Sequence, residues 1–214
     1  MKTYKFFPQE ILEWRTKQLI LGGTNYELDY LLDLGGGLNR VDMHKIYLGN
    51  LNIICLNKSL KDLSILWEKY INENIPLQYL IGTCFWRDFE LEIDPSAMIP
   101  RQETELLIDF AIDIFKDMPI GRWADLGTGS GILSIALARN FPLWEGHVVD
   151  ISNKALCLAE RNLKLLAANA KYTLHLGNWW DPLYPWWGDL TLVLANPPYI
   201  PNYLMRTIDP LVLN

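Results

Sequence analysis

The feature that most constrains the fold is the regular exchange of short apolar strands and helices between residues 122 and 195. The expected strands are residues 122–126, 147–150, 172–176 and 190–195, and the expected helices are residues 131–140 and 153–167. Strands that alternate with helices form a parallel sheet through right-handed crossovers. We therefore expect an α/β fold with a doubly wound parallel sheet in the carboxyl-terminal half of the chain.

A glycine-rich loop, DLGTGSG at residues 125–131, joins the first strand to the first helix. Glycine permits positive φ and close approach of a ligand to the backbone, and the amino terminus of a helix lies behind it. Open α/β sheets bind ligands at the carboxyl ends of their strands. The loop therefore indicates a nucleotide-like cofactor at that edge.

Asp150 ends the second strand, where its carboxylate can accept hydrogen bonds from both hydroxyls of a ribose. This feature is shared by enzymes that use NAD and enzymes that use S-adenosylmethionine. The glycine spacing is Asp-x-Gly-x-Gly-x-Gly and departs from the GxGxxG of dinucleotide sites. An aspartate that only caps a helix or closes a turn is the alternative.

The last expected strand stops at Asn196-Pro197-Pro198-Tyr199. Two prolines fix φ and remove two N–H donors, so this turn presents carbonyl oxygens and one amide side chain, with an aromatic ring next to them. Two acceptors and a ring suit a planar –NH2 group. A proline-rich loop after a core strand is the plainer interpretation.

In this order, residues 125–131, Asp150 and the Asn-Pro-Pro-Tyr turn resemble class I methyltransferases that use S-adenosylmethionine. Residues 76–82 (PLQYLIG) and 99–107 (IPRQETELL) are similar to signatures of the glutamine-N5 methyltransferases of peptide chain release factors, the HemK/PrmC type. The resemblance covers residues 76–214 well. Residues 1–75 are similar in helical character only.

The resemblance implies three parts: a helical substrate-recognition domain at 1–80, a β-hairpin linker at 81–98, and a Rossmann-like S-adenosylmethionine-binding domain at 99–214. The substrate would be the glutamine of the Gly-Gly-Gln motif of class I release factors. The implied cofactor-binding residues are Gly127, Thr128, Gly129, Ser130, Gly131, Asp150, Trp179 beside the adenine, and Asn196. The implied substrate-binding residues are Asn196, Pro197, Pro198 and Tyr199, of which Asn196, Pro197 and Tyr199 are the catalytic candidates.

The implied chemistry is consistent with these residue types. An amide nitrogen is a poor nucleophile because its lone pair is delocalised into the carbonyl. The Asn196 side-chain oxygen and the Pro197 carbonyl would hold the –NH2 hydrogens, aim the nitrogen at the methyl carbon and favour the positive charge that develops on it. The sulfonium supplies the leaving group, so neither a metal nor a covalent enzyme intermediate is expected.

The amino-terminal region is expected to contain helices near residues 11–20 and 25–35, a third after Asp42, and one that Ser59 caps with Asp62. A bundle that only packs is the alternative to a partner-docking module. From residues 99–105 onward we expect a helix whose apolar face carries Leu106, Leu107, Phe110, Ala111 and Ile114.

The composition of the chain limits which binding partners and which cellular compartment we expect. The net charge is -6, which argues against nucleic acid as a direct partner, since nucleic-acid binders usually show a basic footprint. The three cysteines are dispersed, and no apolar run approaches the length of a membrane span. We expect a cytoplasmic monomer without a membrane contact.

The chain also departs from the pattern that it resembles. Gln102 stands where a second proline is usual, and Asn178 replaces an aspartate next to Trp179, which removes a carboxylate contact to the adenine. The chain ends at Asn214, whereas the family continues through further strands. We therefore expect a truncated four-stranded sheet in order 3-2-1-4, marginal stability and weak or no activity.

Four alternatives stay open at this point. An adenine-N6 nucleic-acid methyltransferase also uses Asn-Pro-Pro-Tyr, although the acidity of the chain counts against it. A close variant would methylate a glutamine of a ribosomal protein. The glycine spacing argues against an NAD-dependent oxidoreductase. The fourth alternative is a truncated protein that binds the cofactor but has no activity.

Overall fold

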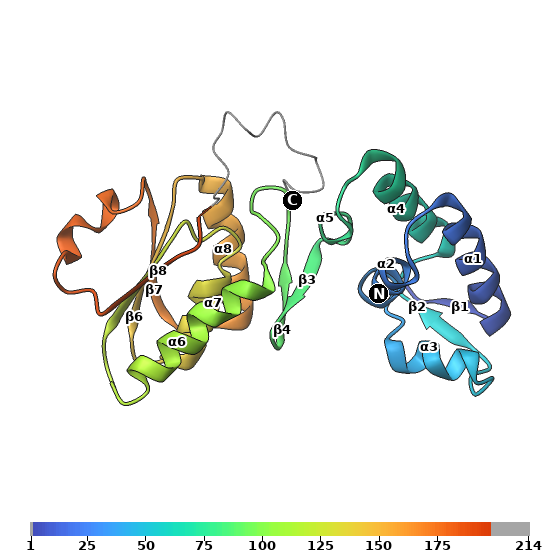
Figure 1. Ribbon diagram of the computed structural model, residues 1–214, viewed down its shortest axis with the longest axis horizontal. Helices are drawn as coiled ribbons and strands as arrows, with labels where there is room; N and C mark the ends of the chain where they lie inside the picture. The colour runs from blue at the N-terminus through green and yellow to red at the C-terminus, as the bar shows by residue number, and fades with distance from the viewer. Residues whose placement is uncertain (1, 198–214) are drawn as a thin grey trace. The chain divides into compact units, whose positions relative to one another are not determined.

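The computed structural model describes residues 2–197, so Pro198 and Tyr199 of the predicted site lie outside the described residues. The described chain divides into two compact units, residues 2–83 and 84–197, and Figure 1 shows the elements of each. The boundary falls at the first residue of the β-hairpin. The three-part assignment of functions to residues 1–80, 81–98 and 99–214 stays a prediction.

The first unit is mainly helical, as predicted. Its elements are β1 (Tyr4–Phe6), α1 (Pro8–Leu21), α2 (Asn25–Tyr30), the π-helical turn η1 (Leu31–Gly35), α3 (Arg40–Tyr47), β2 (Ile54–Leu56), α4 (Leu60–Glu73) and α5 (Leu77–Ile81). Ser59 caps α4, as predicted: its Oγ accepts from the Asp62 N–H at 3.1 Å and donates to the Asp62 carboxylate at 2.7 Å. This exchange satisfies donors that the first helical turn leaves without partners.

An antiparallel pair of short strands, β1 and β2, is the element that the sequence analysis missed. Tyr4 pairs with Leu56 and Phe6 with Ile54. Three residues are too few to establish a period of two in the sequence. The apolar core of this unit includes Trp67, which is completely buried, and its indole N–H donates to the Gln18 carbonyl at 3.0 Å.

The second unit contains the hairpin and the α/β part. Its elements are β3 (Thr83–Trp86), β4 (Phe89–Glu92), the 3-10 turn η2 (Gln102–Thr104), α6 (Glu105–Phe115), β5 (Arg122–Leu126), α7 (Ile132–Asn140), β6 (Glu145–Asp150), α8 (Asn153–Leu166), β7 (Lys171–Leu176), the 3-10 turn η3 (Asp181–Trp186) and β8 (Leu192–Ala195). The predicted hairpin is β3 and β4, which pair in a sheet of their own.

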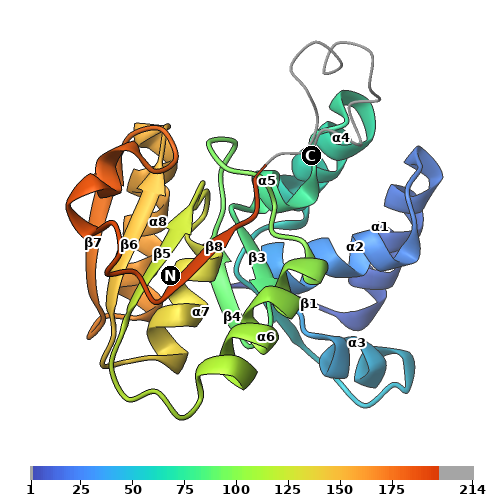
Figure 2. The same cartoon turned by 60° about the vertical axis from the view of Figure 1, so that its left-hand side comes forward.

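The main sheet has the order β7-β6-β5-β8, and all of its neighbouring strands are parallel. This is the predicted 3-2-1-4 order. Helices α7 and α8 lie on one face of the sheet, and the segment that contains η3 covers the other (Figures 1 and 2). On the η3 face, Leu183 packs with Ala124, Leu126 and Val149 in a buried apolar cluster.

The face predicted for α6 is wrong at most of its positions. Leu106, Phe110 and Ile114 are 57%, 63% and 71% exposed, and of the predicted face only Ala111 is buried, together with Ile108, which was not predicted. The helix is apolar on more than one side, so the periodicity of its sequence does not define the buried face. In residues 2–197, no helix is both long and apolar enough to cross a membrane.

Candidate active site

The carboxyl ends of the four parallel strands form the edge at which the predicted site residues gather. Leu126 of β5 pairs with Val149 of β6 and with Ala195 of β8, and Asp150 pairs with Leu176 of β7. The strand ends are therefore level. The glycine-rich loop, Asp150, Trp179 and Asn196 all follow or occupy these ends, so the fold brings together the predicted residues that the structure describes.

The glycine-rich loop faces open space at Gly127 and is closely packed at Gly131. Gly127 has a φ of 73°, and a Cβ added there would meet no atom within 4 Å. Gly131 has a φ of 85°, and a Cβ there would lie 3.0 Å from the Ala159 Cα of α8. Gly131 thus permits the close packing of α7 and α8, while the backbone at Gly127 remains open to a ligand.

The N–H groups of this loop are largely used inside the protein. The pairs are Gly127 N–H to the Val149 carbonyl at 2.9 Å, Thr128 N–H to the same carbonyl at 3.0 Å, Gly129 N–H to the Asp150 Oδ2 at 3.0 Å, and Gly131 N–H to the Thr128 carbonyl at 2.9 Å. A pyrophosphate site needs such groups directed at the ligand. These four are therefore not offered to a phosphate.

Asp125, in β5, anchors the glycine-rich loop through buried hydrogen bonds. It is buried, and its Oδ2 accepts from the Thr128 hydroxyl at 2.7 Å and from the Ser134 N–H and hydroxyl at 3.1 and 2.7 Å. Among the described residues, its Oδ1 has no hydrogen-bond partner. Burial raises the pKa of Asp125, and the hydrogen bonds from Ser134 and Thr128 oppose that shift. The Thr128 side chain therefore belongs to the scaffold of the loop.

Asp150 makes the backbone contacts of a turn aspartate, and its carboxylate can accept further hydrogen bonds. Its Oδ2 accepts from the Gly129 N–H at 3.0 Å, and its Oδ1 accepts from the Ser152 N–H at 2.8 Å. A carboxylate offers about four lone-pair positions, so both oxygens retain acceptor capacity. The charge of Asp150 also helps to raise the pKa of Asp125. The Asp150 carboxylate makes this edge favourable for a cation, whereas burial favours the neutral form of Asp125.

Trp179 lies beyond the end of β7 in an uncommon backbone conformation. Its φ is 47°, in the left-handed region that few residues other than glycine adopt, and the residue is 46% exposed. Gly177, two positions earlier, donates its N–H to the Asp150 carbonyl at 3.0 Å. The Trp179 segment is therefore tied to the strand end that carries Asp150.

Asn196 follows β8 and contacts a residue that the sequence analysis did not single out. Its Nδ2 donates to the Thr104 hydroxyl at 2.8 Å, and Thr104 is only 5% exposed. Thr104 ends η2, inside the 99–107 stretch. Two segments singled out separately in the sequence thus meet through one hydrogen bond. Pro197 follows in a half-buried position.

Sequence reasoning missed three residues that support this edge: Thr104, Ser134 and Asn162. Asn162 carried a readable signal, because it occupies the buried stripe of α8 together with Ala155, Leu158 and Ala159. A buried amide must find hydrogen-bond partners. In residues 2–197 no group of three or more histidine, cysteine or acidic side chains is placed to hold a metal ion.

Comparison with known proteins places this site in a class. The family described as "Methyltransferase small domain" matches residues 103–206, which include the glycine-rich loop, Asp150 and Asn196. The fold and the matched domain define a methyltransferase.

Curated relatives identify the family within that class. The release factor glutamine methyltransferase of Prochlorococcus marinus is 52% identical over 209 residues, which are 97% of this chain and 71% of the relative. That of Thermosynechococcus vestitus is 42% identical, over 73% of this chain and 54% of the relative. This chain belongs to the release factor glutamine methyltransferase family. It spans between about half and three quarters of the length of these relatives.

Among solved structures, the N-terminal domain of human METTL16 in complex with SAH is similar to this chain, with a TM-score of 0.40 and 14% identity. The match covers 82% of this chain and 66% of that chain. A similarity of this size does not support a functional assignment.

Proposed function

We propose that this chain transfers a methyl group from S-adenosylmethionine to the side-chain amide nitrogen of the glutamine in the Gly-Gly-Gln motif of class I peptide chain release factors. The observation that carries the proposal is the gathering of the glycine-rich loop, Asp150 and Asn196 at one sheet edge, in a chain 52% identical to a protein of that name.

The contacts of the described residues support S-adenosylmethionine as the cofactor. The loop directs four of its N–H groups inward, and the Asp150 carboxylate, which retains acceptor capacity on both oxygens, lies at the same edge. This arrangement disfavours a pyrophosphate and suits a cationic ligand, which speaks against the NAD-dependent alternative. Residues 127–131, Asp150, Trp179 and Asn196 would hold the cofactor, which supplies an activated methyl group on a sulfonium.

Asn196 and Pro197 would hold the substrate. The Asn196 side-chain oxygen and the Pro197 carbonyl are the proposed acceptors for the two hydrogens of the glutamine –NH2. The bond from Asn196 Nδ2 to Thr104 restricts the rotation of the Asn196 amide, so its acceptor is held in one direction. Correct alignment of two reactants contributes on the order of 7–11 kcal/mol to barrier reduction. Pro198 and Tyr199 complete the proposed substrate site.

Several finer assignments are part of the same proposal. Residues 1–80 recognise the release factor, the chain acts as a monomer in the cytoplasm, and it contacts neither nucleic acid nor a membrane. The acidic net charge of -6 supports the assignment to a protein substrate.

The first test is calorimetric titration with S-adenosylhomocysteine. We expect micromolar binding by the wild-type chain and its loss in Asp150→Ala. Asp113→Ala removes the same charge from an exposed position on α6 and should bind like the wild type. A folded wild-type chain that does not bind would contradict the proposed cofactor site.

The second test measures methyl transfer from labelled S-adenosylmethionine. The substrates are a class I release factor, its Gly-Gly-Ala variant and an adenine-containing oligonucleotide. We expect label in the first substrate only. Label in the oligonucleotide would support the adenine-N6 alternative. Cofactor binding without transfer to any of the three would support a cofactor-binding protein without this activity.

A further inference from the structure

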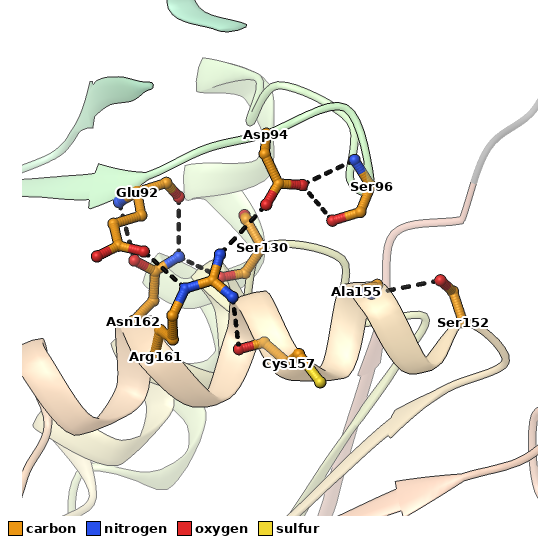
Figure 3. A network of polar contacts seen from close by, with 9 residues as sticks. All are labelled: Glu92, Asp94, Ser96, Ser130, Ser152, Ala155, Cys157, Arg161 and Asn162. Atoms are coloured by element: carbon orange, nitrogen blue, oxygen red, sulfur yellow. Dashed lines mark hydrogen bonds and ion pairs between the residues drawn. The ribbon is translucent and has the colours of Figure 1, made fainter. Parts of the chain in front are cut away.

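Asn162 is a buried amide that joins three segments of the second unit. It is completely buried on α8. Its Nδ2 donates to the Ser130 carbonyl and to the Glu92 carbonyl, both at 2.9 Å, and its Oδ1 accepts from the Glu92 N–H at 2.9 Å. Figure 3 shows this side chain between β4 and the glycine-rich loop.

These bonds fix the orientation of the amide. Both Nδ2 hydrogens have an acceptor, and Oδ1 has a donor. The opposite orientation would set the amide oxygen against the carbonyls of Ser130 and Glu92, which have no hydrogen to donate. Asn162 therefore has one favourable position, and a satisfied buried network of this kind is rigid.

The contact with Ser130 restrains the loop from a side that its other bonds do not use. The N–H groups of Gly127, Thr128 and Gly129 are held by the end of β6, at Val149 and Asp150. Asn162 instead holds the Ser130 carbonyl from α8 and, through the Glu92 backbone, from β4. The open backbone of the loop is thus fixed between the sheet and the hairpin.

We propose that Asn162 is a positioning residue for cofactor binding: it sets the glycine-rich loop by anchoring the Ser130 carbonyl to the backbone of β4. This inference rests on the proposed function, because the loop is the proposed cofactor site. It makes cofactor affinity depend on the hairpin, although the hairpin supplies no predicted cofactor-binding residue.

The adjacent residue, Arg161, provides a matched control. Its Nε lies 2.8 Å from the Glu92 carboxylate and its Nη2 lies 3.2 Å from the Asp94 carboxylate. Its side chain is 49% exposed, and exposed ion pairs contribute little. Arg161→Gln removes contacts to the same hairpin without touching the Ser130 carbonyl. Leu163→Ala, at the next position, opens a cavity at a completely buried leucine and serves as the destabilised control.

The experiment measures affinity for S-adenosylhomocysteine by calorimetry and amide hydrogen exchange of residues 127–131 in the ligand-free protein. Asn162→Asp keeps an acceptor for the Glu92 N–H and removes both donated bonds, and Asn162→Ala removes all three. We expect the Kd to rise about tenfold or more in both, the effect of one such bond, with faster exchange in the loop. Arg161→Gln and folded Leu163→Ala should stay within about twofold of the wild type.

Two results would overturn the inference. One is an unchanged Kd and unchanged loop exchange in the Asn162 variants. The other is an equal loss of affinity in Leu163→Ala, because the effect would then follow stability alone. If the wild-type chain itself fails to bind, the proposed function is contradicted, while the exchange of the ligand-free loop still decides whether Asn162 positions it.

Discussion

The two units differ in what they bury. In residues 2–83 the buried side chains are almost all apolar, and Gln18 is the exception among the described residues. In residues 84–197 the buried set also contains polar and charged residues: Thr104, Asp125, Thr128, Ser130, Ser134, His147, Asp150 and Asn162. Most of these lie at or beneath the carboxyl edge of the sheet.

The difference separates two ways of ordering a chain. An apolar core is non-directional and stabilises in proportion to the area removed from water. A buried hydrogen-bond network adds less net stability, but it defines one arrangement, because each unsatisfied group is costly. The first unit is therefore expected to respond to lost volume, and the second to lost hydrogen bonds.

The largest effect is expected from Trp67→Ala in the first unit. The substitution removes a completely buried ring and its bond to the Gln18 carbonyl, so the free energy of unfolding of this unit should fall by about 3–5 kcal/mol. Hydrogen exchange should accelerate across residues 2–83. Ile65→Ala, at a position 45% exposed on the same helix, should change exchange little. Equal effects of the two variants would show that this core does not stabilise the unit.

Ser134→Ala should act on the second unit through lost hydrogen bonds and not through lost volume. The substitution removes the hydroxyl that donates to Asp125 at 2.7 Å and lies 3.2 Å from the Thr128 hydroxyl. Where Asp125 is ionised, a bond to its charge contributes about 1.5–3 kcal/mol. Because that bond lowers the pKa of Asp125, its loss raises the folded-state pKa, and the destabilisation should grow as pH rises and the carboxylate ionises. Denaturation at pH 5 and pH 8 checks this sign. A larger loss at pH 5 would contradict an ionised Asp125 held by Ser134.

The two units also show which parts of the molecule could be predicted from sequence. The Ser59 cap, the parallel strands and the position of the glycine-rich loop between β5 and α7 depend on neighbouring residues or on periodicity, and these predictions are confirmed. The role of that loop in cofactor binding stays a prediction. The bond between Asn196 and Thr104 joins distant segments, so only the assembled sheet reveals it.

The two wrong expectations for secondary structure and burial also arise from contacts between distant segments. The β1–β2 pair depends on a distant partner for each short strand. The face of α6 was chosen from a pattern that fits two sides, and the burial of Ile108 instead of Phe110 follows from tertiary packing. Asp150 is not one of these errors: its bonds to Gly129 and Ser152 give it a role in the turn, and its contact with a ribose stays a prediction.

Thr104→Val should lower turnover without a comparable loss of cofactor affinity. Valine keeps the volume of threonine but offers no acceptor to the Asn196 Nδ2. We expect kcat to fall roughly tenfold, the effect of about one hydrogen bond, while the Kd for S-adenosylhomocysteine changes less. Thr104→Ser restores the hydroxyl and should restore kcat. A serine variant as slow as the valine variant would exclude positioning through this bond.

The smallest effect is expected from a histidine pair on the η3 face of the sheet. The His147 Nδ1 lies 3.0 Å from the His175 Nε2, and the Trp186 ring packs against both, at centroid distances of 4.4 and 5.2 Å. Burial lowers the pKa of both imidazoles. The charge of His175 and of Arg122 lowers the pKa of His147 further, and Glu145 opposes them.

A lowered histidine pKa means that the folded protein binds fewer protons than the unfolded chain. The stability that the pair contributes is therefore present above the unfolded pKa of about 6.5 and is lost as pH falls below it. We expect the Tm of the second unit to decline between pH 7 and pH 5.

His175→Gln keeps a polar partner for His147 but removes one titrating group, so the decline should be shallower. His44 in the first unit is exposed, and His44→Gln should leave the slope unchanged. If the His44 variant flattens the slope as much as the His175 variant does, the acid sensitivity does not arise from the pair of His147 and His175.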